Sequence, residues 1–409
     1  MSFPFKLPML LDGATATNLM NAGMPSGVCV EKWIYDNPAP LLKLQSDFVK
    51  AGSQAVYAPT FGANPILLAA YHLDDQVAEL NTRLVEYSKS LGVPVGGSLC
   101  PTGLFVEPFG SADFDDIYEC YREQVRALDD AGVDFIVIET QTSLADMRAA
   151  VLAARTTNLP VFVTITVDES GHTLTGGSLL PTVITLQAMG ADAIGLNCSF
   201  GPKAMLPFIE EVIPHANVPI IAKPNAGVPM YGTTEKSGYL PPEEFADEMR
   251  ELLRAGVGIV GGCCGTTPEH IAALRKVVEE FGAEQFSEAR YEDADCYAAA
   301  IEGEAFFLGD DIMLSEPIPV TSGLGDDLID LDDEQVNAAL VEITSMDDAM
   351  MLARSASMSR LPIAVRSDSL PILDAALRYF QGRLIIDTNC PIEKELIERI
   401  AAKYGAILY

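Results

Sequence analysis

Three cysteines close two apolar segments of this sequence. Cys198 ends the run Ala-Ile-Gly-Leu-Asn-Cys, and Cys263 and Cys264 end the run Gly-Ile-Val-Gly-Gly-Cys-Cys. A structural zinc ion takes four protein ligands, whereas a catalytic zinc ion keeps one position open for water or substrate. Three cysteines with no evident fourth ligand therefore indicate a catalytic zinc site. The pattern alone leaves open that these thiols are core residues, or that the vicinal pair oxidises.

The glycines beside the cysteine pair bear on whether both sulfurs can face one ion. Adjacent residues of a strand point to opposite faces. Cys263 and Cys264 can therefore converge only where a strand gives way to a turn. Gly261, Gly262 and Gly265 supply the backbone freedom that such a turn needs.

The composition describes a long, acidic chain. Its 409 residues exceed one average domain, but they accommodate a barrel of roughly 250 residues and a smaller unit. The net charge of -32 argues against nucleic acid and anionic membranes as partners, because both attract basic surfaces. The eight cysteines lack paired spacing, which predicts reduced thiols. With no secretory signal and no apolar run of membrane length, we expect a soluble cytoplasmic protein.

Eight short apolar runs alternate with helix-like segments through the first two thirds of the chain. Continuous apolar runs are typical of buried parallel strands, and the segment 113–131 between two of them has an amphipathic stripe. Eight β-α units predict a (β/α)8 TIM barrel. The expected strands are residues 9–13, 55–60, 94–99, 135–140, 161–167, 193–198, 219–225 and 258–264.

Polar residues follow several of these strands. Chemistry in TIM barrels lies at the carboxyl ends of the strands, so residues from non-adjacent strands can meet at the mouth. Glu139 could instead cap the next helix, and Asp12 could stabilise its own turn. The candidates at strand ends are Asp12, Gly13, Thr60, Glu139, Asn197, Cys198, Cys263 and Cys264.

A second alternation of strands and helices follows the barrel region. It predicts a small C-terminal α/β domain with a parallel sheet. Strands are expected at 338–344, 361–366, 383–388 and 405–408, and helices at 345–357, 370–380 and 391–404. We predict a barrel over 1–285, an acidic linker over 286–303 and the small domain over 304–409.

Seven motifs occur in order through the barrel region. They are Leu-Leu-Asp-Gly-Ala (10–14), Thr-Phe-Gly-Ala-Asn (60–64), Gly-Ser-Leu-Cys-Pro-Thr-Gly (97–103), Glu-Thr (139–140), Gly-Leu-Asn-Cys (195–198), Lys-Pro-Asn-Ala-Gly (223–227) and Gly-Gly-Cys-Cys-Gly-Thr-Thr-Pro-Glu-His-Ile (261–271). This ordered set resembles the homocysteine S-methyltransferase family. That family includes the homocysteine domain of cobalamin-dependent methionine synthase and betaine-homocysteine methyltransferase.

The resemblance implies zinc-dependent transfer of a methyl group to homocysteine, giving methionine. It implies that the three cysteines hold the zinc and that the homocysteine sulfur completes the tetrahedron. It also implies that Glu139 and the turn at Asp12 and Gly13 bind the amino-acid end of the substrate. Thr60 and Asn197 are further candidates for substrate contact.

The methyl donor is left open by the sequence. Residues 361–369, 382–389 and 402–408 look similar to part of a pterin-binding barrel, but the region is too short for a whole one. We find no cobalamin module, so a corrinoid would have to arrive on a separate protein. A small donor such as S-methylmethionine or a betaine is the other source. The alternative function is a non-catalytic homocysteine-binding or assembly subunit that docks a corrinoid or methyltransferase partner.

Overall fold

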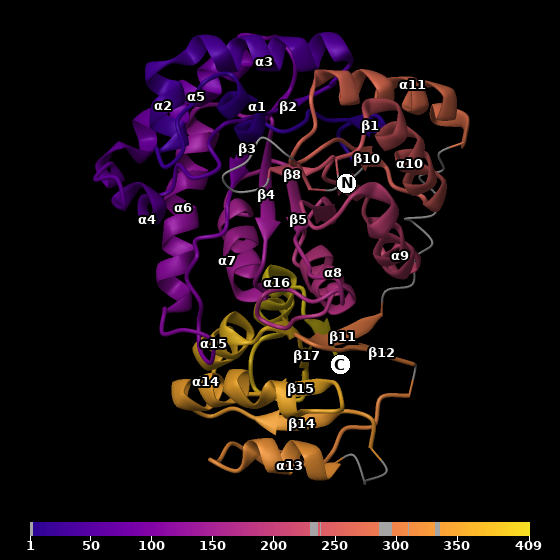
Figure 1. The fold of residues 1–409 in the computed structure, drawn as a ribbon. Helices are drawn as coiled ribbons and strands as arrows, with labels where there is room; N and C mark the ends of the chain where they lie inside the picture. The colour runs from indigo at the N-terminus through magenta and orange to yellow at the C-terminus, as the bar shows by residue number, and fades with distance from the viewer. Residues whose placement is uncertain (1–2, 230–235, 238, 286–296, 310, 332–335) are drawn as a thin grey trace.

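The computed structural model describes residues 3–229, 236–237, 239–285, 297–309, 311–331 and 336–409. Its larger part contains an eight-stranded sheet in the order β1-β10-β7-β6-β5-β4-β3-β2 (Figure 1), in which neighbouring strands run parallel. Each strand overlaps one of the eight predicted runs, so the predicted barrel is confirmed. The strands are β1 (Met9–Leu10), β2 (Val56–Ala58), β3 (Val95–Leu99), β4 (Phe135–Gln141), β5 (Val161–Ile165), β6 (Ala193–Asn197), β7 (Ile220–Lys223) and β10 (Ile259–Val260).

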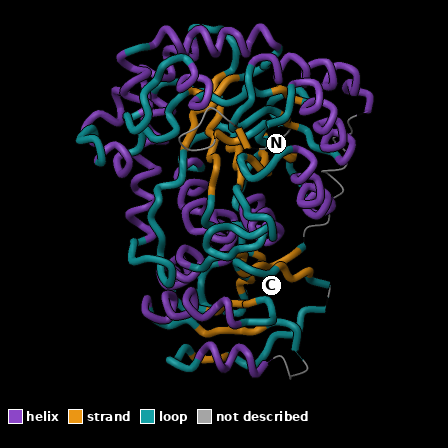
Figure 2. The backbone as a smooth tube through the Cα atoms, viewed as in Figure 1, coloured by secondary structure: helices purple, strands orange, loops and turns teal. Residues whose placement is uncertain are grey.

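Helices surround this sheet (Figure 2). Their apolar faces pack on the strands, as in α6, where Ile117, Tyr121 and Val125 are buried along one stripe. None of the helices in the described ranges is long and apolar enough to cross a membrane. The barrel helices are α1 (Ala16–Asn21), α2 (Val30–Asp36), α3 (Pro38–Ala51), α4 (Pro65–Ala69), α5 (Val77–Lys89), α6 (Phe114–Asp130), α7 (Leu144–Ala154), α8 (Leu179–Ala188), α9 (Pro202–Val212), α10 (Pro242–Ala255) and α11 (Pro268–Gln285), and β8 (Val228–Pro229) pairs with β9 (Lys236–Ser237) outside the barrel sheet.

Hydrogen bonds between β1 and β2 close the barrel. The Gln54 N–H donates to the Leu10 carbonyl at 2.7 Å, and the Gln54 side chain accepts from the Leu10 N–H at 2.7 Å. The Asp12 carboxylate accepts the Tyr57 N–H at 2.9 Å, and its other oxygen pairs with the Lys223 ammonium at 2.9 Å. Because β1 and β2 are the two ends of the strand order, these contacts complete the ring.

The C-terminal part forms a separate parallel sheet, as predicted. Its strand order is β13-β14-β15-β17-β18, and all four pairings are parallel. The strands are β13 (Ile318–Pro319), β14 (Ala339–Glu342), β15 (Ile363–Arg366), β17 (Ile385–Ile386) and β18 (Ile407–Leu408), and the helices are α13 (Leu324–Asp330), α14 (Met346–Ser355), α15 (Leu370–Tyr379) and α16 (Lys394–Tyr404).

The linker predicted over 286–303 was wrong at its C-terminal end. Strand β11 (Ala298–Ile301) lies within that range and pairs antiparallel with β12 (Ala305–Phe307) and with β16 (Gly382–Arg383). Its four small or apolar residues are buried, partly against α8, which explains why they form a strand. The preceding residues 286–296 lie outside the described part of the chain.

Helix α7 joins the barrel to the C-terminal sheet and helices. Every residue of α7 is buried, as expected for a helix covered on both sides. The guanidinium of Arg148 donates to the carbonyls of Leu377 at 2.6 Å and Arg378 at 3.0 Å, at the end of α15. A cation at a helix C-terminus stabilises the carbonyls left unpaired there. The Arg378 side chain also pairs with Asp115 at the start of α6, at 2.5 Å.

The Asp12 and Lys223 pair provides a test of barrel closure. We expect Asp12→Asn to lower the free energy of unfolding by about 3–5 kcal/mol, because it leaves the Lys223 charge buried without a counter-charge. Urea denaturation measures the change. Asp36→Asn is the control: it breaks an ion pair with Lys32 at the surface and should have little effect. Equal effects of the two variants would contradict this role for Asp12.

Asp146 in α7 makes the stability of the fold depend on pH. Its carboxylate accepts the Thr102 N–H and hydroxyl, both at 2.9 Å, and burial raises its pKa from 3.8 to about 6. The folded state therefore binds the Asp146 proton more tightly than the unfolded state does. The stability that this proton contributes is lost as pH rises through about 6. Relative to Asp146→Asn, the free energy of unfolding of the natural protein should fall by up to about 3 kcal/mol as pH rises from 3.8 to about 6. Urea denaturation at several pH values tests this, and a pH-independent difference between the two proteins would contradict it.

Candidate functional site

A cavity of about 350 Å³ lies at the carboxyl end of the barrel strands. Six of the eight predicted site residues line it, which are Asp12, Gly13, Glu139, Cys198, Cys263 and Cys264. Tyr57, Lys223, Ser98 and Glu31, which the sequence did not single out, also line it. The barrel therefore brings together residues from most of its strands, as its topology requires.

The three cysteine sulfurs form one cluster. All lie within 4.8 Å of one another, and the Sγ atoms of Cys198 and Cys264 are 3.6 Å apart. That separation is far longer than a disulfide bond of about 2.05 Å. In a tetrahedral site with Zn–S bonds of about 2.3 Å, neighbouring sulfurs lie about 3.8 Å apart. The spacing therefore fits a zinc ion bound by three thiolates.

The backbone on either side of the cluster holds the sulfurs in place. Cys198 has a left-handed conformation with φ of 58°, and the Asn225 side chain donates to its carbonyl. Gly265 has φ of +81°, and a Cβ there would lie 2.1 Å from the Gly227 carbonyl oxygen. The expectation of a glycine-dependent turn thus holds at Gly265.

Gly261 and Gly262 serve a different purpose from the one expected. Neither has positive φ. A Cβ on Gly261 would lie 2.9 Å from the Asp12 carbonyl oxygen, and one on Gly262 would lie 2.4 Å from the Thr266 hydroxyl. Gly261 therefore allows the chain to pass close to the first strand, and Gly262 leaves room for the Thr266 side chain. The turn itself begins after these two glycines.

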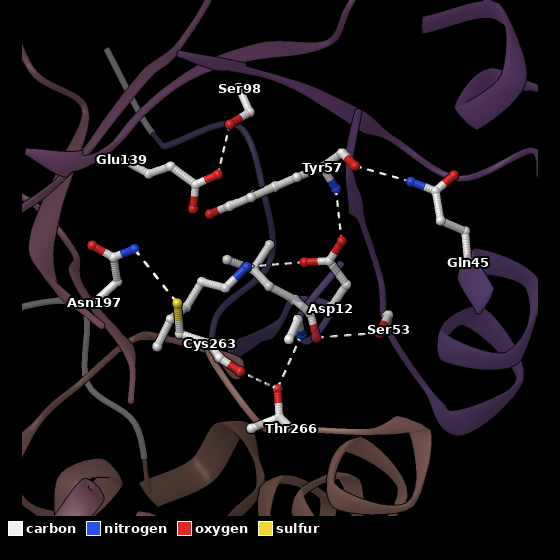
Figure 3. Close-up of polar contacts among 12 residues, drawn as sticks. Asp12, Gln45, Ser53, Tyr57, Ser98, Glu139, Asn197, Cys263 and Thr266 are labelled. Carbon is white, nitrogen blue, oxygen red and sulfur yellow. Dashed lines mark hydrogen bonds and ion pairs between the residues drawn. The ribbon is translucent and has the colours of Figure 1, made fainter. Parts of the chain in front are cut away.

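The hydrogen bonds of the cluster favour an anionic sulfur. Cys198 and Cys263 donate hydrogen bonds to the Cys264 sulfur, and these bonds lower the pKa of Cys264 to about 3. The Asn197 amide also lies 3.9 Å from the Cys263 sulfur (Figure 3). Donors of this kind stabilise thiolates and orient metal ligands.

Asn197 and Thr60 lie behind the cavity wall. The Asn197 amide bonds to the backbone and hydroxyl of Thr140, at 3.0 and 2.8 Å. The Thr60 hydroxyl bridges β2 and β3 through the backbone of Ser98, at 2.9 and 3.0 Å. Both residues are fully buried, and the cavity lining does not include them. Neither side chain therefore lines the cavity in this structure, where the sequence suggested substrate contact.

Glu139 is the predicted substrate-binding carboxylate, and it reaches the cavity. Its Oε1 accepts the Ser98 hydroxyl at 2.6 Å. Burial raises the pKa of Glu139, although the Lys223 charge and the Ser98 hydrogen bond oppose this effect. A carboxylate in such a site is suited to bind a cationic group.

Among the residues around Glu139, Lys223 lies at the end of a strand, but the residues that it contacts could not be predicted from strand ends alone. Lys223 is 3% exposed, and its ammonium lies 3.7 Å from the centroid of the Tyr57 ring as well as beside Asp12. Burial alone would lower the pKa of Lys223, but the nearby anions have the larger effect and raise it above its usual value. The ammonium group therefore stays charged. Glu31 lies in helix α2, and its carboxylate accepts the Gly62 N–H at 2.7 Å. Because it does not follow a strand, no strand-end signal indicated it. A polar residue ending an apolar run was the available signal for Lys223.

Comparisons with known proteins match the part of the chain that contains these site residues. A family model described as homocysteine S-methyltransferase matches residues 9–278. The methionine synthase of Mycobacterium leprae (strain TN) is 28% identical over 429 residues, and that of Mycobacterium tuberculosis (strain ATCC 25618 / H37Rv) is 28% identical over 425. Both alignments cover 93% of this chain and 35% of the relative, so the chain spans about a third of their length.

Solved structures of a homocysteine methyltransferase, MmuM from Escherichia coli, share the barrel. The oxidised form is 25% identical with a TM-score of 0.57, and the apo form is 26% identical with a TM-score of 0.53. Each match covers 66% of this chain and 95% of the MmuM chain. The family model spans well over half of the sequence and contains all three clustered cysteines and Glu139. This chain therefore belongs to the homocysteine S-methyltransferase family.

Proposed function

We propose that this protein transfers a methyl group to the thiol of homocysteine at a zinc ion held by Cys198, Cys263 and Cys264. The observation that carries the proposal is the spacing of three sulfurs at the mouth of the barrel. Among the described residues, no histidine, carboxylate or further cysteine joins this group. The fourth tetrahedral position is therefore available to the substrate sulfur.

Zinc bound there would supply a Lewis acid that keeps the substrate thiol deprotonated at neutral pH, where a thiol with a pKa of about 8.5 is mostly protonated. Three thiolate ligands give the centre a net negative charge, which leaves a fourth sulfur nucleophilic. Asn197 orients Cys263 through its amide. Glu139 binds the ammonium group of the amino acid.

Asp12 acts indirectly in this proposal. Its two oxygens are engaged by Lys223 and by the Tyr57 N–H. It therefore positions the cavity wall, and the close packing at Gly13 supports the same turn: a Cβ there would lie 2.8 Å from Phe48 and from the Thr266 hydroxyl. We propose that the amino-acid end of the substrate is bound against this turn.

The likeness to methionine synthases supports a proposal for the C-terminal domain. The family model ends at residue 278, whereas the alignments cover 93% of the chain and must continue into residues 304–409. We propose that this domain corresponds to part of a pterin-binding barrel, since its five parallel strands are fewer than a barrel needs. We propose that the methyl donor is a corrinoid protein or a small methyl donor. No specific observation favours a non-catalytic subunit.

Removal of one cluster thiol tests the metal site. The purified protein should contain about one zinc ion per chain, and Cys263→Ala or Cys198→Ala should lose most of it, because two thiolates cannot replace three. Metal analysis and circular dichroism measure zinc content and fold. Cys390→Ala is the matched control, since this thiol lies in the C-terminal domain outside the cluster. Full zinc retention in both cluster variants would refute the site.

A donor panel tests the reaction. Zinc-loaded protein with homocysteine should produce methionine from at least one of methylcobalamin, S-methylmethionine, glycine betaine, or methyltetrahydrofolate with a corrinoid protein. With the active donor, Glu139→Gln should raise the KM for homocysteine by about 10- to 100-fold, because a charge-assisted hydrogen bond is lost. No methionine from any donor, with zinc bound, would count against the enzyme.

A further inference from the structure

Tyr57 carries a buried hydroxyl without a hydrogen-bond partner among the described residues. The residue is 5% exposed, its hydroxyl oxygen is buried, and its ring lines the cavity. Burial of an unpaired hydroxyl is unfavourable, and native structures rarely leave one without a reason. The backbone of the same residue is satisfied, because its N–H bonds to Asp12.

The charges around this hydroxyl leave one side of the cavity anionic. Lys223 lies over the Tyr57 ring at 3.7 Å, but its charge is matched by Asp12 at 2.9 Å. The Tyr57 hydroxyl points toward the Glu139 carboxylate in Figure 3, and the charge of Glu139 acts on it. Ser98 occupies only one oxygen of Glu139. This side of the cavity therefore suits a cation that can also donate hydrogen bonds.

We propose that the Tyr57 hydroxyl binds the α-ammonium group of the amino-acid thiol and, with Glu139, selects thiols that carry this group. With the ammonium bound between the two side chains, the phenol oxygen can accept one N–H while the second oxygen of Glu139 accepts another. Substrate binding would thus pair a hydroxyl that is otherwise unpaired. The inference rests on the proposed homocysteine-binding function.

Tyr121 provides a matched comparison within the same barrel. It is also fully buried, but its hydroxyl donates to the Cys100 carbonyl at 2.8 Å, and it is not part of the cavity lining. Tyr121→Phe should therefore lower the Tm and leave thiol binding unchanged. Tyr57→Phe should leave the Tm unchanged or higher in the absence of thiol, because it removes an unpaired polar atom.

The experiment is calorimetric titration of the zinc-loaded full chain with two thiols and no methyl donor. One is L-homocysteine, and the other is its desamino analogue, which keeps the thiol and the carboxylate. Tyr57→Phe should raise the Kd for homocysteine by about 10- to 100-fold and leave the Kd for the analogue unchanged. Tyr121→Phe should change neither Kd. Zinc content is measured on each protein.

The outcomes separate the inference from the function on which it rests. If the natural protein does not bind homocysteine, the proposed function fails. If it binds homocysteine, but Tyr57→Phe binds it equally well or weakens both thiols alike, only the assignment of Tyr57 is overturned. A lower Tm in Tyr57→Phe, with unchanged thiol preference, would likewise show a purely structural tyrosine.

Discussion

The buried ion pair between Asp12 and Lys223 is the interaction on which the site depends. Two opposite charges at 1% and 3% exposure are tolerated only because each neutralises the other. Asp12 also accepts the Tyr57 N–H, so one carboxylate joins the first strand to β2 and β7. In the sheet order β10 lies between β1 and β7, and it leads directly to Cys263 and Cys264. The pair thus fixes both neighbours of the strand that delivers two sulfurs.

The end of β7 links the two parts of the sulfur cluster. The Cys198 N–H donates to the Lys223 carbonyl at 3.3 Å, and the Cys263 N–H donates to the Pro224 carbonyl at 2.8 Å. The Ala226 N–H returns to the Cys264 carbonyl at 2.9 Å. The segment after β7 is therefore bonded to both cysteine-bearing segments. Backbone contacts therefore set the spacing of the sulfurs, so the proposed zinc ion would bind with little reorganisation of the chain.

The sequence predicted the parts of this site that follow from chain order. Parallel strands of a barrel place all their carboxyl ends at one mouth, so the cysteines and Glu139 could be brought together without coordinates. Tyr57 could not be found this way, because its role depends on which charges face it across the barrel. Strand β11 was missed for a related reason: it pairs with β16, far along the chain, and a local acidic composition conceals it.

The position of the C-terminal domain constrains how a methyl donor can reach the sulfurs. The domain is fixed to the barrel through α7, where Arg148 bonds to the end of α15, and through β11, which packs on α8. Every residue that lines the sulfur cavity nevertheless belongs to the barrel. A ligand held by the small domain would therefore not touch the cluster in this arrangement. In the proposed reaction, the methyl group has to enter through the mouth of the barrel, so the βα loops around that mouth would select the donor.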